Sequence, residues 1–231
     1  MGKQGLITIT NPGVMTFDVV CEHPDIEKDT VIVTLEVSGE IFDRIVFTRR
    51  TIVRRQYFFS KSFVGQSLRF SVSRTWNPQS FGEKWARAQG VAVSTPLYSD
   101  GIPAQGIGLS VWEKITGPLP EWAHFGQRYR WTGHRATLRI DAGMRREGLR
   151  MFLRSRHPDL LKKPVRVDIL AGEKRVRELV LSSDEWQTVF IEPMEMTRAG
   201  ALTIKVDRTW NPFLSGVSQD TRELGVMLAL P

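Results

Sequence analysis

Cysteine is nearly absent from this chain, since Cys21 is the only one among 231 residues. No intramolecular disulfide can therefore form. Cys21 follows Phe17 and Val19 at even spacing, so the three side chains share one side of an extended strand. Free cysteines are among the most buried residues, and we expect Cys21 to fill space in a core.

Long hydrophobic runs are also missing. No stretch approaches the roughly 18 apolar residues that a membrane-spanning helix needs. Met1–Gly13 has no apolar segment of the kind that a signal peptide carries. The sequence therefore does not assign a cellular compartment. If the protein acts at the cell surface, a parent protein or a partner would supply the targeting signal or the link to the surface.

The motifs of common enzymes and cofactor sites are absent as well. The sequence has no Gly-x-Ser-x-Gly, no P-loop, no His-Glu-x-x-His and no paired-cysteine zinc motif. His23 and His157 have no companions at ligand spacing, which argues against a metal site. A glycosidase pair of carboxylates leaves no such signature, but no pair stands out. We therefore expect a non-catalytic chain without cofactor or metal.

Basic residues exceed acidic residues by a small margin. The chain has 32 basic and 25 acidic residues, for a net charge of +7. Such an excess can attract nucleic acid or an anionic polymer. The basic residues form small groups such as Arg49-Arg50 and Lys162-Lys163, and no RNA- or DNA-binding motif accompanies them. A solvated β-surface is the simplest interpretation, and we expect no nucleic-acid partner.

The sequence does contain two motifs twice. Arg-Thr-Trp-Asn-Pro occurs at 74–78 and again at 208–212, an offset of 134. His-Pro-Asp occurs at 23–25 and at 157–159, with the same offset. Two unrelated coincidences would not share one offset, and a repeat of this size has the length of a domain. The sequence therefore predicts an internal duplication.

The duplication predicts two tandem domains, at residues 1–98 and 99–231. The second begins with a leader, residues 99–133, that is rich in Gly, Pro and Trp. The first has no counterpart of this leader, because Met1 aligns approximately with Arg135. Either the first domain has a simpler edge, or the chain was cut from a longer protein whose leader lies upstream.

Alternation of apolar and polar residues with a period of two dominates both copies. It is clear at 31–37 and 68–72, and at the counterparts 165–169 and 202–206. This pattern is typical of half-buried strands. Turns with Gly or Pro separate these segments, and no amphipathic helix of ten or more residues stands out. We predict an all-β chain of two tandem antiparallel jelly-roll-like β-sandwich domains.

The repeated Arg-Thr-Trp-Asn-Pro segment has two interpretations. Arg74 and Trp76 have the inward parity of Val72, and Arg208 and Trp210 repeat this in the second copy. In a structural role, Trp plugs the end of the sandwich, Arg bridges carbonyls in the following loop, and Asn-Pro ends the strand. In a binding role, Trp stacks on a sugar ring while Asn and Arg bond to its hydroxyls. The survival of the segment in both copies favours the structural role.

The second copy carries further motifs in a characteristic order. Pro-Glu-Trp at 120–122 and Arg-Trp-Thr-Gly at 130–133 come first, and Ser-x-Asp-x-Arg-x-Leu-Gly-Val closes the copy at 218–226. Over Leu119–Leu230 this order resembles a β-sandwich domain associated with bacterial glycosyltransferases and cell-surface polysaccharide proteins. It also resembles carbohydrate-binding jelly rolls in general. The resemblance implies a carbohydrate partner, a glycan or polysaccharide, and an accessory role within a larger system.

These motifs indicate one candidate ligand-binding site, which only the second copy has: Glu121, Arg130, Trp131, Asp220 and Arg222. Trp131 would stack on a sugar ring, and the charged groups would bond to its hydroxyls. The alternative is that Asp220 or Glu121 forms an ion pair with Arg130 or Arg222 that only closes the sandwich. The chain would then be a structural or protein-interaction module without a sugar site.

Overall fold

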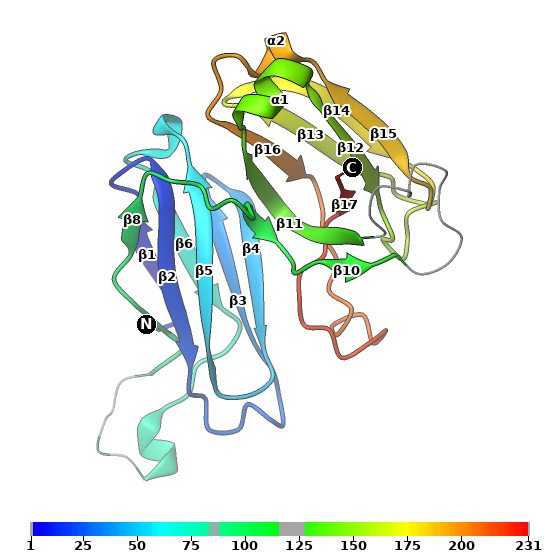
Figure 1. Cartoon of the computed structure of the whole chain (residues 1–231). Coiled ribbons are helices and arrows are strands. Elements are labelled where there is room, and N and C mark those ends of the chain that lie inside the picture. The colour runs from blue at the N-terminus through cyan, green and yellow to red at the C-terminus, as the bar shows by residue number, and fades with distance from the viewer. Residues whose placement is uncertain (1, 83, 85–87, 116–127, 231) are drawn as a thin grey trace. The chain divides into compact units, whose positions relative to one another are not determined.

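The structure is a computed structural model (Figure 1) that describes residues 2–82, 84, 88–115 and 128–230. It divides into two compact units. The first unit consists of Met1–Gly101 with Pro212–Glu223, and the second consists of Ile102–Asn211 with Leu224–Pro231. The sequence predicts a second domain over 99–231, whereas Pro212–Glu223 groups with the first unit here, and the predicted domain boundaries stay a prediction.

The described part of the first unit forms two antiparallel sheets. Its strands are β1 Gln4–Thr8, β2 Gly13–Cys21, β3 Val31–Val37, β4 Glu40–Phe47, β5 Thr51–Phe59, β6 Ser67–Val72, β7 Ala92–Val93 and β8 Leu97–Ser99. One sheet has the order β1-β6-β3-β4, and the other has the order β5-β2-β7, with β8 also paired to β2. Two short 3-10 helices, Lys61–Phe63 and Pro78–Phe81, lie in the connections.

The second unit forms one continuous antiparallel sheet. Its elements are β9 Ile107–Leu109, β10 Glu113–Lys114, β11 Arg128–Arg139, α1 Ala142–Glu147, β12 Leu149–Arg154, β13 Val165–Ala171, β14 Lys174–Leu181, β15 Gln187–Ile191, α2 Pro193–Met196, β16 Ala201–Val206 and β17 Met227–Ala229. The order is β14-β13-β16-β11-β17-β12-β15, with β9 and β10 also paired to β11. The long β11 pairs with β17 near its start and with β16 near its end, so it joins both halves. No described helix is long and apolar enough to cross a membrane.

Each unit has a hydrophobic core of its own. In the first unit, Phe17 of β2 packs edge-on against Phe70 of β6, with ring centroids 5.4 Å apart, so the core lies between the two sheets. Cys21 is fully buried in this core. The predictions of an all-β antiparallel sandwich, of the four alternating strands and of a buried Cys21 are confirmed.

The two units pair their strands in the same register. Val19 of β2 pairs with Val53 of β5, and adding 134 to both gives the pair Leu153 and Gln187 of β12 and β15. The register of the β3–β4 pair likewise matches that of the β13–β14 pair, and the β-bulge occurs at the equivalent residue in both. The register of the β3–β6 pair also matches that of the β13–β16 pair. That the two units arose by duplication stays a prediction.

The predicted alignment of the chain start is wrong by three residues. Ile7 pairs with Leu68 in the first unit, and Leu138 pairs with Leu202 in the second, so Ile7 and Leu138 correspond at an offset of 131. The counterpart of Arg135 is therefore Gln4 rather than Met1. The second unit uses its longer connection after β11 to form α1, whose first turn is capped by Asp141.

Candidate functional site

The two repeated motifs form one cluster in each unit. In the first unit, the turn after β2 holds His23 and Asp25, and the segment after β6 brings Arg74 and Trp76 to it. The Nδ1 atom of His23 lies 2.6 Å from Oδ1 of Asp25. Arg74 donates to the same oxygen at 2.8 Å. The rings of His23 and Trp76 are 6.3 Å apart and tilted by 57°.

The second unit repeats this cluster closely. The Nδ1 atom of His157 lies 2.5 Å from Oδ1 of Asp159, and Arg208 donates to that oxygen at 2.6 Å. The rings of His157 and Trp210 are 6.4 Å apart and tilted by 55°. Two regions of different surrounding sequence thus build one arrangement from the same four residue types.

The cluster fastens a loop to the end of a strand. Arg74 donates to the backbone carbonyls of Asp25 and Asp29, which lie in the loop between β2 and β3. The sequence interpretation placed these carbonyls in the following loop, whereas they lie in the preceding one. Trp76 then pairs with Gln89 through two backbone hydrogen bonds of 2.8 Å, and Trp210 pairs with Leu224 through bonds of 3.0 and 2.8 Å. The structural role of the segment agrees with these contacts.

Neighbouring charges and burial shift the pKa values of three groups in the clusters. Hydrogen bonds from Arg74 and Arg208 lower the pKa values of Asp25 and Asp159, so both carboxyls are ionised at neutral pH. Burial, followed by the positive charge of Arg208, lowers the pKa of His157. The imidazole of His157 is therefore neutral near pH 7, and in the second cluster Arg208 and Asp159 form a matched pair of opposite charges.

A cavity of about 670 Å³ opens beside the cluster of the first unit. Its walls come from the end of β2, the start of β5, the turn after β2, and the segment from Trp76 to the short helix Pro78–Phe81. The lining residues are Val20, Cys21, Glu22, Pro24, Arg50, Thr51, Ile52, Trp76 and Phe81. This volume lies within the range of about 300–1,000 Å³ that ligand pockets usually have.

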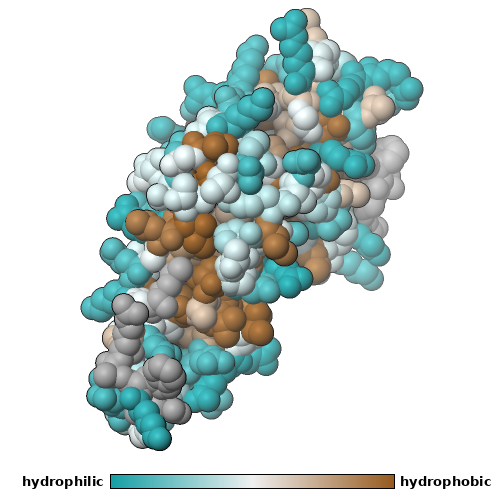
Figure 2. Space-filling view, turned by 90° about the vertical axis from the view of Figure 1, so that its left-hand side faces the viewer, coloured by the Kyte–Doolittle hydropathy of each residue, from teal (hydrophilic) through white to brown (hydrophobic). Residues whose placement is uncertain are grey.

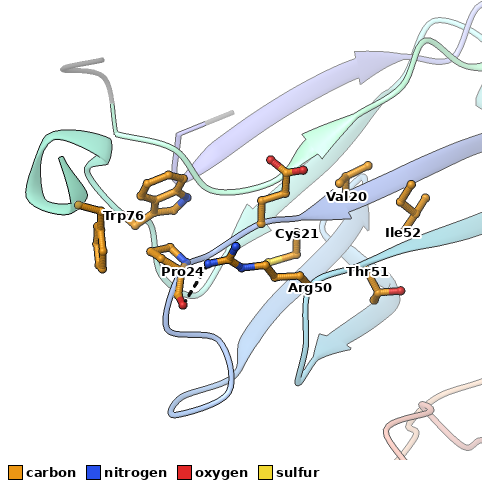
Figure 3. Close-up of a pocket in the computed structure, with 9 residues that line it drawn as sticks. Val20, Cys21, Pro24, Arg50, Thr51, Ile52 and Trp76 are labelled. Atoms are coloured by element: carbon orange, nitrogen blue, oxygen red, sulfur yellow. Dashed lines mark hydrogen bonds between the residues drawn. The ribbon is translucent and has the colours of Figure 1, made fainter. Parts of the chain in front are cut away.

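The cavity combines an aromatic corner with charged groups. Trp76 and Phe81 meet edge to face, with centroids 5.7 Å apart, and 51% of Phe81 is exposed. In Figure 3, Trp76, Pro24 and the guanidinium of Arg50 gather at one end, and Ile52 lies at the other. Figure 2 shows further hydrophobic patches among hydrophilic ones on one face of the molecule.

The polar groups of the cavity have little to bond within the described chain. Arg50 donates one hydrogen bond, of 3.3 Å, to the carbonyl of Pro24. Glu22 is exposed and forms no ion pair with a described residue. Burial raises the pKa of the Cys21 thiol, so this wall is neutral and apolar at neutral pH. Arg50 and Glu22 are thus available to a bound molecule.

The second unit has larger and paired side chains at the equivalent positions. Adding 134 to Val20, Arg50 and Ile52 gives Arg154, Asp184 and Trp186. Arg154 and Asp184 form an ion pair of 2.6 Å, and the guanidinium lies over the ring of Trp186 at 5.9 Å. Trp186 packs against a hydrophobic cluster formed by Trp131, Leu224 and Met227.

The predicted ligand-binding residues of the second copy are mostly engaged in packing. Glu121 lies outside the described residues. Arg130 is 8% exposed, and burial lowers its pKa. Its guanidinium donates to the carbonyls of Gln105, Leu109 and Ser110, and lies over the Trp112 ring at 5.4 Å. Arg130 thereby fastens the leader to β11.

Trp131 lies in the core of its cluster rather than on the surface. It is 8% exposed, and its ring meets that of Tyr129 edge to face at 6.0 Å. Its backbone N–H bonds to the hydroxyl of Ser110. A stacking tryptophan must be accessible before a sugar binds, so the geometry of Trp131 is that of a plug.

Asp220 and Arg222 pair with each other. The sequence interpretation placed them on one side of an extended strand, but they lie in a loop between Asn211 and Leu224. Oδ1 of Asp220 accepts from the backbone N–H of Arg222, and the guanidinium reaches Oδ2 at 2.6 Å. Burial raises the pKa of Asp220, but the hydrogen bonds from Arg222 outweigh it and lower the pKa overall. The sugar-binding role of these five residues stays a prediction.

Sequence reasoning missed the cavity because its lining residues are scattered. Glu22 follows β2, Arg50 precedes β5, and Phe81 ends a short helix, so no spacing rule links them. One signal was present. Trp76 and Pro24 belong to the repeated motifs, and the residues adjacent to those motifs were therefore the place to search.

No family model matches the chain, and no curated protein matches it significantly. Solved structures that are similar to it include the protein YhaK from Escherichia coli, with 11% identity, a TM-score of 0.24, and coverage of 99% of this chain and 83% of that one. Another is the N-terminal CBM22 tandem domain of Xyn10C from Paenibacillus barcinonensis, with 10% identity, a TM-score of 0.26, and coverage of 97% and 80%. A third is the M60 catalytic domain with two CBM51 domains of ZmpB from Clostridium perfringens, with 9% identity, a TM-score of 0.24, and coverage of 99% and 33%. At these TM-scores the likeness carries no argument.

Proposed function

We propose that the chain is a non-catalytic carbohydrate-binding protein whose site is the cavity of the first unit. The observation that carries this proposal is the pairing of an aromatic corner, half-buried Trp76 and exposed Phe81, with the available polar groups of Arg50 and Glu22. An aromatic face suits the apolar C–H face of a sugar ring. Carboxylate and guanidinium groups suit the hydroxyls around it.

The composition of the cavity favours binding over catalysis. Glycoside hydrolysis usually needs two carboxyl groups that flank the bond, and Glu22 is the only carboxylate among the described lining residues. A thiol acts as a nucleophile only when it is ionised, and burial keeps the Cys21 thiol protonated. We therefore assign the site no reaction.

The accessory role in a bacterial surface-glycan or glycosyltransferase system rests on the motif order of the second copy. A carbohydrate-binding chain would hold such a system near its polymer. Single sites of this kind are weak, and the two units would add avidity only if both bind. The proposal places one site in the cavity of the first unit and leaves the predicted site of the second sequence copy to direct test.

A glycan array followed by calorimetric titration tests the proposal. We expect Phe81→Ala to weaken binding of the best array sugar at least about tenfold, because the substitution removes the exposed ring of the corner. The melting temperature should hardly change, since Phe81 is mostly on the surface. Phe190→Ala, which alters an exposed ring of the second unit, is the matched control and should leave affinity unchanged. Equal loss in both variants, or none in Phe81→Ala, would refute the site.

A structural module is the second candidate function, and the engagement of Arg130 and Trp131 favours it for the second unit. Arg130 bonds to three carbonyls, and Trp131 is a core residue. Under this candidate, the array gives no hit with any saccharide, and the exposed surfaces contact a protein instead.

A further inference from the structure

We infer that the cavity of the first unit selects sugars that carry an anionic group, a carboxylate or a sulfate, and that Arg50 binds this group. The inference rests on the proposed function, because it names the ligand class of the same site. It is based on two observations. Arg50 has no carboxylate partner among the described residues, and the equivalent positions of the second unit have different charges.

Arg50 differs from Arg54 and Arg55 of the following strand in what it contacts. Arg54 pairs with Asp18 at 2.8 Å, and Arg55 pairs with Asp43 at 2.8 Å. Among the residues the structure describes, Arg50 has no carboxylate partner and donates only to the neutral carbonyl of Pro24. A guanidinium has a planar fork of donors that fits a carboxylate or a sulfate group, so Arg50 is a cation without its usual anion.

The position of Arg50 makes it suitable for a group attached to a sugar ring. Figure 3 shows its guanidinium beside Pro24, at the same end of the cavity as Trp76. A ring that stacks in the aromatic corner would therefore place a substituent near the guanidinium. Glu22 lines the same cavity and carries the opposite charge. The carboxylate of Glu22 can accept a hydrogen bond from a sugar hydroxyl, and it repels a second anionic group nearby. The site therefore suits a sugar ring that carries a single anionic group.

The second unit shows the opposite arrangement at the equivalent positions. Asp184 stands where the first unit has Arg50, and Arg156 stands where it has Glu22. Asp184 contacts both Arg154, at 2.6 Å, and Arg156, at 3.6 Å. Both arginines of the second unit thus contact a carboxylate, whereas Arg50 has no carboxylate partner among the described residues.

The test compares three trisaccharides in calorimetric titrations at low salt: trigalacturonic acid, its full methyl ester, and a sulfated galactose trisaccharide. We expect the methyl ester to bind at least about tenfold more weakly than the acid, as the loss of a charge-assisted hydrogen bond predicts. Whichever of the acid and the sulfated sugar binds more tightly identifies the anionic group. Raising the salt from about 20 to about 300 mM should weaken the anionic sugars only, because salt screens exposed charges.

Two arginine variants separate the site from general charge attraction. Arg50→Gln should bind the acid and the ester equally. Arg49→Gln removes the same charge from the neighbouring exposed residue, which does not line the cavity, and should keep the preference for the acid. Glu22→Gln should strengthen binding of the acid, because a negative charge leaves the site.

The outcomes distinguish this inference from the proposed function. If the acid and the ester bind equally to the wild type, and Phe81→Ala still removes binding, the anionic preference is overturned and the sugar site stands. The same holds if Arg49→Gln and Arg50→Gln have equal effects. If no saccharide on the array binds, or if binding survives Phe81→Ala, the proposed function itself fails.

Discussion

The two units share their strand registers and their His–Asp–Arg–Trp clusters, yet they differ at the strand ends beside those clusters. The first unit has a cavity there, with Ile52 and Arg50 on its wall. The second has Trp186 and an ion pair between Arg154 and Asp184 at the same positions. The shared strand registers and clusters stabilise the fold of each unit. The residues at the strand ends differ between the units, so a binding site can change there without disturbing the core.

The comparison also shows what two of the motif residues of the second copy contact. The second copy has more tryptophans and more ordered motifs, and the sequence therefore predicts the sugar site there. In the structure, Arg130 and Trp131 lie inside the packing between the leader and β17. Arg130 and Trp131 are thus both buried in the first residues of β11, and their role in sugar binding stays a prediction.

The largest expected effect concerns the tryptophans of the repeated segment. Trp210 packs against the cluster of Trp131, Leu224 and Met227, so Trp210→Ala should lower the free energy of unfolding by about 3–5 kcal/mol. Trp76 borders the cavity and has fewer neighbours to lose, so Trp76→Ala should cost less, about 1–3 kcal/mol. Urea titrations of both variants measure the difference.

Trp210→Phe controls for the polar atom of the indole. The buried Nε1 of Trp210 has no hydrogen-bond partner within the described chain, so replacing Trp by Phe removes no bond. We expect a cost of about 1.5 kcal/mol or less, from lost volume alone. If Trp76→Ala and Trp210→Ala lowered the free energy of unfolding equally, the contrast between the cavity beside Trp76 and the packed cluster around Trp210 would be wrong.

Filling the cavity should make the first unit resemble the second. Ile52 corresponds to Trp186 and is 64% exposed, so Ile52→Trp should change stability by only about 0.5 kcal/mol. The larger ring would occupy the cavity and weaken sugar binding at least about tenfold. Leu97→Trp, at another exposed position of the same unit, is the control and should leave affinity intact. Unchanged affinity in Ile52→Trp would show that the sugar binds elsewhere.

The sequence predicted the periodic parts of the molecule and the equivalence of its repeats. Alternation places Val33 and Leu35 inside, and the offset of 134 places Trp76 and Trp210 in equivalent bridges, because backbone pairing follows sequence order. The cavity could not be predicted, because its residues follow no period and meet only when the loops fold. The bonds of Arg130 to three carbonyls were also hidden, since backbone acceptors have no sequence signature.

The pH dependence of stability should separate the contribution of His157 from that of the cluster carboxylates. Burial and Arg208 lower the pKa of His157 below its ordinary value of 6.5, so the unfolded chain binds the proton more readily. The resulting stability is complete above pH 6.5 and is lost as the pH falls below it. The ionised Asp25 and Asp159 add a second loss, which begins only near their ordinary pKa of 3.8.

Melting curves between pH 7.5 and 5.5 measure the histidine contribution alone. We expect the melting temperature of the wild type to fall over this range, and His157→Asn to flatten the dependence while lowering the starting value. An unchanged slope in His157→Asn would assign the pH dependence to another group.

The smallest expected effect on stability belongs to Asp220→Asn, and it decides the role of the predicted second site. Asp220 and Arg222 are two residues apart in a loop, and their pair is partly exposed, so solvent screens most of its energy. An asparagine oxygen can still accept the backbone N–H of Arg222. We therefore expect a change of less than about 0.5 kcal/mol in the free energy of unfolding.

The sugar affinity of Asp220→Asn distinguishes the two possible sites more clearly than its stability does. If the cavity beside Trp76 and Phe81 holds the site, the affinity for the best array sugar stays at the wild-type value in Asp220→Asn and falls in Phe81→Ala. If Asp220→Asn weakens binding while stability is preserved, the loop of Asp220 and Arg222 belongs to a binding surface, and the contrast between the units must be drawn differently. A loss of several kcal/mol would instead show that the pair fastens the fold, as a buried ion pair does when one partner is removed.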